Sequence, residues 1–135
     1  MHTCQEHDHA RPHRAALDER AFERAHGFIL QHLGGNISLA DIAAAACISR
    51  FHFARLFRAR TGCSPMAYVM RLRLERAREM LAREDRCIAD TAVSLGFYDQ
   101  SHFSRTFRRV HGMPPRVFRL RSRAAAAASP NHTLS

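Results

Sequence analysis

The feature that most constrains this chain is an internal repeat with a period of about fifty residues. Residues 52–65 and 102–115 are identical at seven of their fourteen aligned positions. Upstream the offset falls to 49, which pairs residues 39–41 with 88–90 and leaves one additional residue in the second copy. Two copies are too few for a solenoid, which needs at least about three stacked repeats. The repeat therefore predicts one structural unit that is present twice.

Each copy is predicted to form a short helix, a tight turn and a longer helix. In the first copy Ser38 can cap a helix over 39–45, with Asp41 as the acid of a capping box, and Ser49 can cap a helix from residue 50 to about 60. In the second copy the helices cover 88–95 and 100 to about 110, with Asp99 as the second cap. A short helix joined to a longer one by such a turn is the helix-turn-helix pattern.

Helices are also predicted outside the two copies. Pro65 begins a long amphipathic linker helix to about residue 83, since proline is favoured in a first helical turn. We expect four arginines on its polar side: Arg71, Arg73, Arg76 and Arg78. One helix, over about 17–32, precedes the first copy, and a short one follows Pro115. The prediction is an all-α fold of seven helices with tandem helix-turn-helix units over about 37–61 and 87–111, preceded by a polar, His-rich tail (1–16) and followed by a C-terminal tail (121–135).

The longer helix of each copy has two different faces. Apolar residues at i, i+3 and i+4 spacing predict a buried face, made of Phe53, Leu56 and Phe57 in the first copy and of Phe103, Thr106, Phe107 and Val110 in the second. The opposite face is predicted to be exposed, with Phe51, Ala54, Arg55 and Arg58 in the first copy and Ser101, Ser104, Arg105 and Arg108 in the second. His52 and His102 lie between the two faces.

The charge of the chain is concentrated in its second part. All 21 basic side chains are arginines, and against 12 acidic ones they give a net charge of +9. Residues 1–49 carry a net charge of −2, whereas residues 50–135, with 17 arginines and six acids, carry +11. Such a basic segment favours binding to a polyanion, and the planar guanidinium can donate two hydrogen bonds to a phosphate or to a guanine edge. A GC-rich genome also yields an Arg- and Ala-rich composition, so charge alone does not decide the function.

Several classes of protein are excluded or disfavoured. Apolar residues make up 46% of the chain, which is enough for a packed core, and no apolar run approaches the roughly 20 residues that span a bilayer. The N-terminus lacks the basic and apolar order of a signal peptide, so we expect a cytoplasmic protein without a membrane partner. No nucleophile elbow, phosphate-binding loop or pair of carboxylates in an apolar setting indicates an enzyme, and no cofactor is expected.

The second copy carries a recognisable signature. Ile88-Ala89, Gly96-Phe97, the run Ser101 to Arg108, then Gly112, Pro115 and Phe118-Arg119 resemble the C-terminal motif of the AraC/XylS family. Residues 37–119 are similar to the whole DNA-binding domain of that family. The resemblance implies two three-helix subdomains joined by the linker helix, with two recognition helices in successive major grooves of double-stranded DNA. It also implies a stand-alone regulator of this family, RNA polymerase as a second partner, an activator role and a monomer on DNA.

The resemblance places the DNA contacts on the exposed faces of the two longer helices. The base-contacting positions fall on Phe51, Ala54, Arg55, Gln100, Ser101, Ser104 and Arg105. Ala54, Ser101 and Ser104 are small enough to permit close approach, and Arg55 and Arg105 can reach guanine O6 and N7. Phosphate contacts are expected at Ser49, His52, Arg58, His102 and Arg108.

The N-terminal tail suggests an alternative function. It holds five potential metal ligands, namely His2, Cys4, His7, His9 and His13. Imidazoles and thiolates bind soft divalent ions, so a metal- or redox-responsive regulator is the competing hypothesis. Two features argue against this alternative. The five residues are irregularly spaced, and a polar tail containing proline is typically unstructured.

Overall fold

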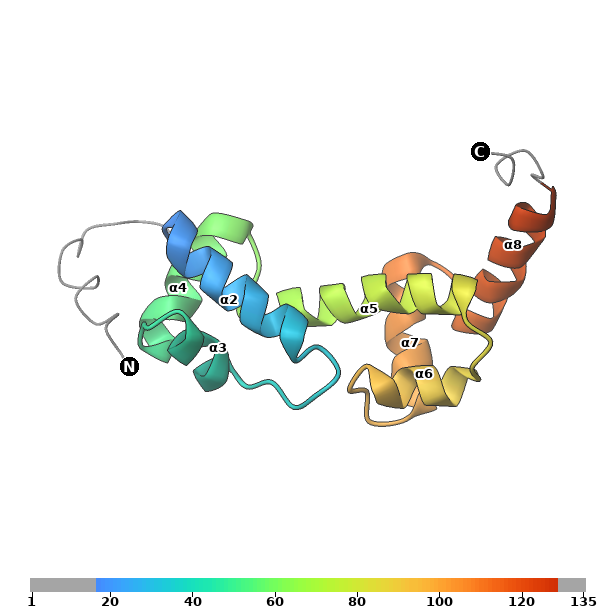
Figure 1. Cartoon of the computed structure of the whole chain (residues 1–135), viewed down its shortest axis with the longest axis horizontal. Helices are drawn as coiled ribbons and strands as arrows, with labels where there is room; N and C mark the ends of the chain where they lie inside the picture. Colours follow the sequence, from blue (N-terminus) through green and yellow to red (C-terminus); the bar gives the residue numbers. More distant parts are fainter. Residues whose placement is uncertain (1–16, 129–135) are drawn as a thin grey trace. The chain divides into compact units, whose positions relative to one another are not determined.

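The computed structural model describes residues 17–128, and every regular element in that range is a helix (Figure 1). The seven helices, in chain order, are α2 (Glu19–Gln31), α3 (Leu39–Ala45), α4 (Arg50–Thr61), α5 (Pro65–Arg83), α6 (Ile88–Ser94), α7 (Gln100–His111) and α8 (Pro115–Ala128). The predicted all-α class is confirmed. The two helix-turn-helix units are α3–α4 and α6–α7, and α5 is the continuous helix between them.

The chain divides into two compact units, and the division falls between Leu72 and Arg73, inside α5. The first unit contains α2, α3, α4 and the beginning of α5. The second contains the remainder of α5 together with α6, α7 and α8. Each helix-turn-helix pair is therefore accompanied by one helical segment before it and one after it. A single long helix supplies the last segment of the first unit and the first segment of the second.

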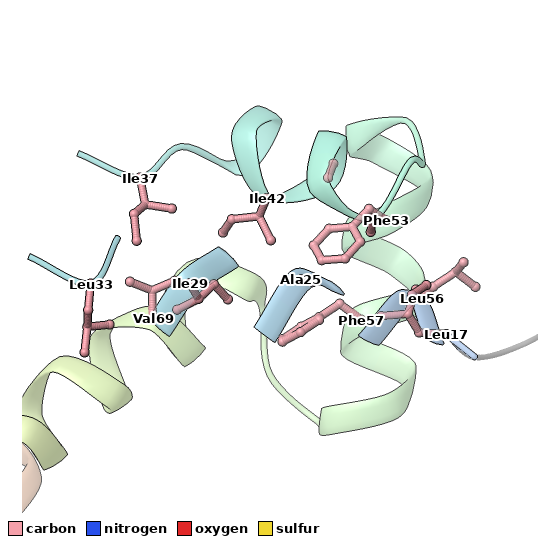
Figure 2. Close-up of a cluster of buried hydrophobic side chains, with 13 residues drawn as sticks. Leu17, Ala25, Ile29, Leu33, Ile37, Ile42, Phe53, Leu56, Phe57 and Val69 are labelled. Atoms are coloured by element: carbon pink, nitrogen blue, oxygen red, sulfur yellow. The ribbon is translucent and has the colours of Figure 1, made fainter. Parts of the chain in front are cut away.

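The core of the first unit draws on all four of its helical segments (Figure 2). Ile29 from α2, Ile42 from α3, Phe53 and Phe57 from α4 and Val69 from α5 are at most 1% exposed. The rings of Phe53 and Phe57 lie 5.4 Å apart, centroid to centroid. Burying a side chain of this size contributes about 1.5–3 kcal/mol, so the apolar face of α4 anchors that helix to the rest of the unit.

The second unit repeats this arrangement. Leu74 and Leu81 of α5 and Phe103 and Phe107 of α7 are completely buried, and the two phenylalanine rings are 5.7 Å apart. Residues 101–116 show the same order of exposed, half-buried and buried positions as residues 51–66, without a single difference. The duplication seen in the sequence is thus a duplication of structure.

Local signals in the sequence set the ends of the helix-turn-helix elements. Ser38 and Asp41 form the predicted capping box at the start of α3, and the side chains of Ser49 and Asp99 accept hydrogen bonds from the third residues of α4 and α7. Gly62 and Gly112 end these two helices in the left-handed conformation, with φ of 87° and 84°. The turn covers residues 46–49 in the first unit and 95–99 in the second, which confirms the one additional residue.

Two side chains lie on a different side from the one predicted. Val110 was expected in the core but is 50% exposed, whereas the next residue, His111, packs its ring 4.6 Å from that of Phe107. Arg73 was expected on the polar side of the linker helix but is only 8% exposed. Its guanidinium occupies the space that a side chain at Gly96 would fill, since a Cβ built there would lie 2.9 Å from the Arg73 Cζ. Burial lowers the pKa of Arg73.

The last helix is longer than the sequence predicted. We expected a short helix followed by a tail from residue 121, but α8 continues to Ala128. Alanine has the highest helix propensity of all residues, so the run of alanines extends the helix without help from packing. Arg123, in the part expected to be a tail, donates hydrogen bonds to the carbonyl of Glu84 at 2.6 Å and to the carboxylate of Asp85 at 3.0 Å.

Candidate nucleic-acid interface

The exposed face of α4 presents the residues predicted to contact bases in the first unit. Phe51 is 73% exposed although it is a large apolar side chain. Arg55 is exposed one turn further on, and Ala54 lies half-buried between them. A single exposed apolar side chain is common on protein surfaces and does not by itself indicate a binding role. The small Ala54 leaves the backbone of the helix accessible between the two larger groups.

The exposed face of α7 places the second predicted set in the same way. Gln100, Ser101 and Arg105 are exposed, and Ser104 is half-buried like its counterpart Ala54. Ser101 and Ser104 present hydroxyl groups at the positions where α4 has the ring of Phe51 and the methyl group of Ala54. The two faces therefore have the same exposure pattern but different chemistry, and they present different donors and acceptors to a partner.

The predicted phosphate contacts surround these faces. Arg58 and Arg108 are exposed in the third turn of their helices, and Ser49 is exposed at the N-cap of α4. The Ser49 Oγ accepts a hydrogen bond from the backbone N–H of His52 at 3.4 Å, which leaves its hydroxyl proton as a donor. Of all the predicted contact residues, Ala54, Ser104 and the two histidines are half-buried and the others are exposed.

Both helices are strongly positive. Neither α4 nor α7 contains an acidic residue, whereas α4 carries four arginines and α7 three. One of these points elsewhere: the Arg60 Nη2 donates to Glu19 at 2.8 Å, and its guanidinium lies 4.1 Å from the centroid of the Phe22 ring. The remaining arginines have no acidic partner among the described residues. Such a surface attracts a polyanion.

Two equivalent histidines stand in the first turn of α4 and α7, and both are half-buried. In α4 the Nδ1 of His52 lies 3.3 Å from the Nη2 of Arg55. In α7 the Nδ1 of His102 lies 3.5 Å from the backbone N–H of Tyr98, and its ring meets that of Phe97 edge to face at 5.4 Å. The same residue type at the same position thus has a different hydrogen-bond partner in each unit.

The sequence reasoning missed two residues of this surface. Arg50 is exposed in the first turn of α4, with its guanidinium 5.2 Å from the centroid of the Phe51 ring. Its repeat partner is Gln100, so the fifty-residue offset would have found it. Tyr98 is 88% exposed in the turn before α7. It is the additional residue of the second copy and has no repeat partner, so the alignment of the copies could not assign it.

Other kinds of site find little support in the described part of the chain. Residues 17–128 contain no group of three His, Cys, Asp or Glu side chains arranged to hold a metal ion. The candidate ligands His2, Cys4, His7, His9 and His13 lie outside the described residues. Among the helices of residues 17–128, none is both long and apolar enough to cross a lipid bilayer.

Comparison with known proteins gives a consistent result. A family model described as a helix-turn-helix domain matches residues 42–121. The probable transcriptional regulator LumQ of Photobacterium leiognathi is 36% identical over 104 residues, which cover 73% of this chain and 42% of LumQ. The transcriptional activator NphR of a Rhodococcus species is 43% identical over 84 residues, which cover 62% of this chain and 25% of NphR. The chain thus spans less than half the length of these relatives.

Solved structures agree with the sequence relatives. The DNA-binding domain of AdpA, a global transcriptional factor solved in complex with a target DNA, superposes with a TM-score of 0.73 at 29% identity, covering 80% of this chain and 96% of that domain. A transcriptional regulator from Chromobacterium violaceum, described as having an AraC-type DNA-binding domain, also gives a TM-score of 0.73, at 30% identity, covering 76% of this chain and 92% of that one.

Proposed function

The chain belongs to the AraC-type helix-turn-helix family of DNA-binding transcription regulators, and from this we propose that it recognises a specific double-stranded DNA site through α4 and α7. The two helices enter the major groove at two neighbouring positions. Proteins of this family are regulators rather than enzymes, so the function lies in the choice of DNA sequence and in the effect on transcription.

The observation that carries this proposal is the identical exposure pattern of residues 51–66 and 101–116. It gives two helices of equal length, each with an arginine at the same exposed position one turn from the N-terminus, namely Arg55 and Arg105. Residues near the N-terminus of a recognition helix contact base edges. Arg58 and Arg108 repeat in the same way one turn further on, so the arginines are the part of the outward face that the two helices share.

The differences between the two helices support an asymmetric DNA site. The first helix presents Phe51 and Ala54, which suit an apolar contact with a thymine methyl group, and the second presents Ser101 and Ser104, which donate and accept hydrogen bonds. Two different surfaces within one chain select two different DNA elements. We therefore propose that one copy of the chain binds as a monomer and that no palindrome is needed.

An effect on transcription requires a second partner. The relative NphR is named a transcriptional activator, which supports an activator role for this chain, with RNA polymerase as the partner at the promoter. The proposed site of action is the bacterial cytoplasm, where chromosomal DNA and RNA polymerase are found.

Selection from a pool of random DNA duplexes tests the proposed function. The protein should enrich one asymmetric sequence with two conserved elements, because each recognition helix favours its own base pairs. A reporter gene with this sequence upstream of a weak promoter should then be expressed more strongly when the protein is present. Enrichment of no sequence above the input pool would contradict specific recognition, and enrichment without any change in expression would contradict the regulatory role.

A further inference from the structure

Arg55, the proposed base contact of the first unit, is held by a neighbouring side chain. Its Nη2 lies 3.3 Å from the Nδ1 of His52, one helical turn earlier on the same face of α4. A guanidinium carries only donors and stays charged in proteins. The Nδ1 of His52 must therefore accept this hydrogen bond, which requires a neutral imidazole with its proton on Nε2.

The second unit has the same two residue types but a different contact. Among the described residues, the Nδ1 of His102 takes the backbone N–H of Tyr98 as its donor, at 3.5 Å, rather than the guanidinium of Arg105. A backbone N–H can only donate a hydrogen bond, so the Nδ1 of His102 must accept it. This ring therefore also carries its proton on Nε2. Both histidines thus have an Nε2–H left to donate, but only His52 is bonded to the arginine of its own recognition helix.

The cause of this difference is the one residue by which the two turns differ in length. Ala46, Cys47 and Ile48 of the first turn correspond to Leu95, Gly96 and Phe97 of the second, as shown by the equivalent bonds from Ile48 N–H to Ala43 and from Phe97 N–H to Ala92. Tyr98 follows as the additional residue. Its N–H has no counterpart in the first unit, and it is this N–H that occupies the Nδ1 of His102.

We propose that His52 is a positioning residue for base recognition by Arg55 and that Tyr98, the additional residue in the second turn, removes this role from His102. This inference rests on the proposed function. In the first unit the guanidinium is held over the N-terminal half of α4, and fixing a long side chain in advance lowers the entropy lost on binding. In the second unit Arg105 contacts its base pair without help from a histidine, and His102 contributes a phosphate contact through Nε2.

Amide substitutions can separate the two nitrogen atoms of the imidazole. In Asn the side-chain oxygen stands at the δ position, where it can replace Nδ1 as the acceptor for Arg55. In Gln the amide stands one bond further out, near the place of Nε2. His52→Asn therefore keeps the proposed contact with Arg55, whereas His52→Gln and His52→Ala remove it. The same three substitutions at His102 form a matched control set.

The experiment measures the affinity of each variant for the preferred duplex and for duplexes with single base-pair changes. The base pair contacted by Arg55 is defined first, as the one whose discrimination Arg55→Ala abolishes. At that base pair, His52→Ala and His52→Gln should lower the discrimination about three- to tenfold, in line with one lost hydrogen bond, and His52→Asn should retain it. None of the three His102 variants should change the discrimination at the Arg105 base pair. His102→Ala and His102→Asn should weaken binding to every duplex alike, whereas His102→Gln should retain the affinity because its amide stands near the place of Nε2. Helix content and melting temperature are measured for every variant.

Three outcomes would overturn the inference while leaving the proposed function intact. The first is a His52→Ala protein with full discrimination at the Arg55 base pair. The second is a loss of discrimination in His52→Asn that His52→Gln does not show, which would assign the effect to Nε2. The third is an equal loss of discrimination in the His52 and His102 sets. A wild-type protein without a preferred duplex would instead contradict the proposed function itself, and the inference with it.

Discussion

At the scale of single residues, Arg55 and Arg105 are the side chains on which we expect sequence recognition to depend most. Each is exposed in the second turn of its helix, and a bidentate contact with guanine contributes about 1–3 kcal/mol of discrimination. Arg55→Ala and Arg105→Ala should each cost about that much on the preferred site and relax selectivity at one cluster of base pairs. The measurement is a titration of each variant on single-substituted duplexes.

Arg58 and Arg108 provide the control for these two substitutions. They are exposed one turn further along the same helices, where we expect contact with phosphates. Arg58→Ala and Arg108→Ala should weaken binding to specific and random duplexes evenly, since phosphates carry no sequence information. If all four alanine variants lose the same affinity on both kinds of DNA, α4 and α7 are not the helices that select the sequence.

Gly96 is the residue whose replacement should show how the second turn is built. Gly62 and Gly96 have nearly equal φ values of 87° and 86°, so replacement by Ala costs each about 1–2 kcal/mol for the left-handed conformation. At Gly96 the new methyl group also meets the guanidinium of Arg73, whereas at Gly62 it meets nothing within 4 Å. Gly96→Ala should therefore lower the free energy of unfolding more than Gly62→Ala does.

Denaturant unfolding of both alanine variants measures this difference. The additional cost at Gly96 should disappear when Arg73→Ala is combined with Gly96→Ala, because the methyl group then has room. Equal costs for the two glycines, or a difference that persists without the guanidinium, would show that Arg73 does not restrict this position.

Single residues also show where prediction from the sequence ends. The exposed faces of α4 and α7 could be predicted from the sequence, because helical spacing decides whether a residue lies on the buried or the exposed side of a helix. The burial of Arg73 did not follow, since it depends on the missing side chain of a glycine 23 positions later in the chain. The different partners of His52 and His102 also depend on three-dimensional distances between side chains and backbone, which no spacing rule contains.

At the scale of helices, α2 and α4 are joined by an ion pair whose contribution should depend on pH. The Arg60 guanidinium, which bonds to Glu19 at 2.8 Å, lowers the pKa of that carboxyl through the hydrogen bond and its charge. A carboxyl whose pKa is lower in the folded protein stabilises the fold above its ordinary pKa of about 4.3, and this stabilisation is lost as the pH falls. Glu19→Gln should therefore melt at a lower temperature than the wild type at pH 7 and at the same temperature near pH 3.

Thermal melting between pH 3 and pH 7 checks this expectation. Glu79→Gln serves as the matched control, because Glu79 is exposed on α5 and forms no ion pair among the described residues. Its melting temperature should follow that of the wild type throughout the range. The effect of Glu19→Gln should be small, as surface ion pairs are screened by water. A difference that stays constant down to pH 3 would show that the contribution of Glu19 is not electrostatic.

The helices themselves were predictable to the extent that their ends are encoded locally. Caps such as Ser38, Ser49 and Asp99 and the glycines that end α4 and α7 fixed the predicted boundaries to within a residue or two. The end of α8 was not predicted, because an alanine run has helix propensity but no stop signal. The hydrogen bonds of Arg123 with the segment after α5 are contacts between distant parts of the sequence, which a local pattern does not reveal.

At the scale of the whole molecule, the distribution of charge predicts a strong dependence of DNA binding on salt. Residues 50–135 carry a net charge of +11, and the arginines of α4 and α7 are exposed, all but Arg60 without an acidic partner among the described residues. Each phosphate neutralised by a protein releases counterions, so six or more such contacts mean a loss of roughly 10³ or more in affinity between 50 and 200 mM salt. Titrations of duplex DNA over this range provide the measurement, and a nearly flat response would contradict an interface dominated by phosphates.

If one chain places two recognition helices on one DNA site, as proposed, its affinity must depend on the spacing of the two DNA elements. The selected duplex is compared with a version that has five additional base pairs between its elements, and footprinting with titration gives the affinity and the protected bases. Half a helical turn moves the second element to the opposite side of the DNA. We expect an asymmetric footprint of one protein copy and a large loss of affinity on the altered duplex. Undiminished binding, or a symmetric dimer on a palindrome, would contradict tandem recognition by one chain.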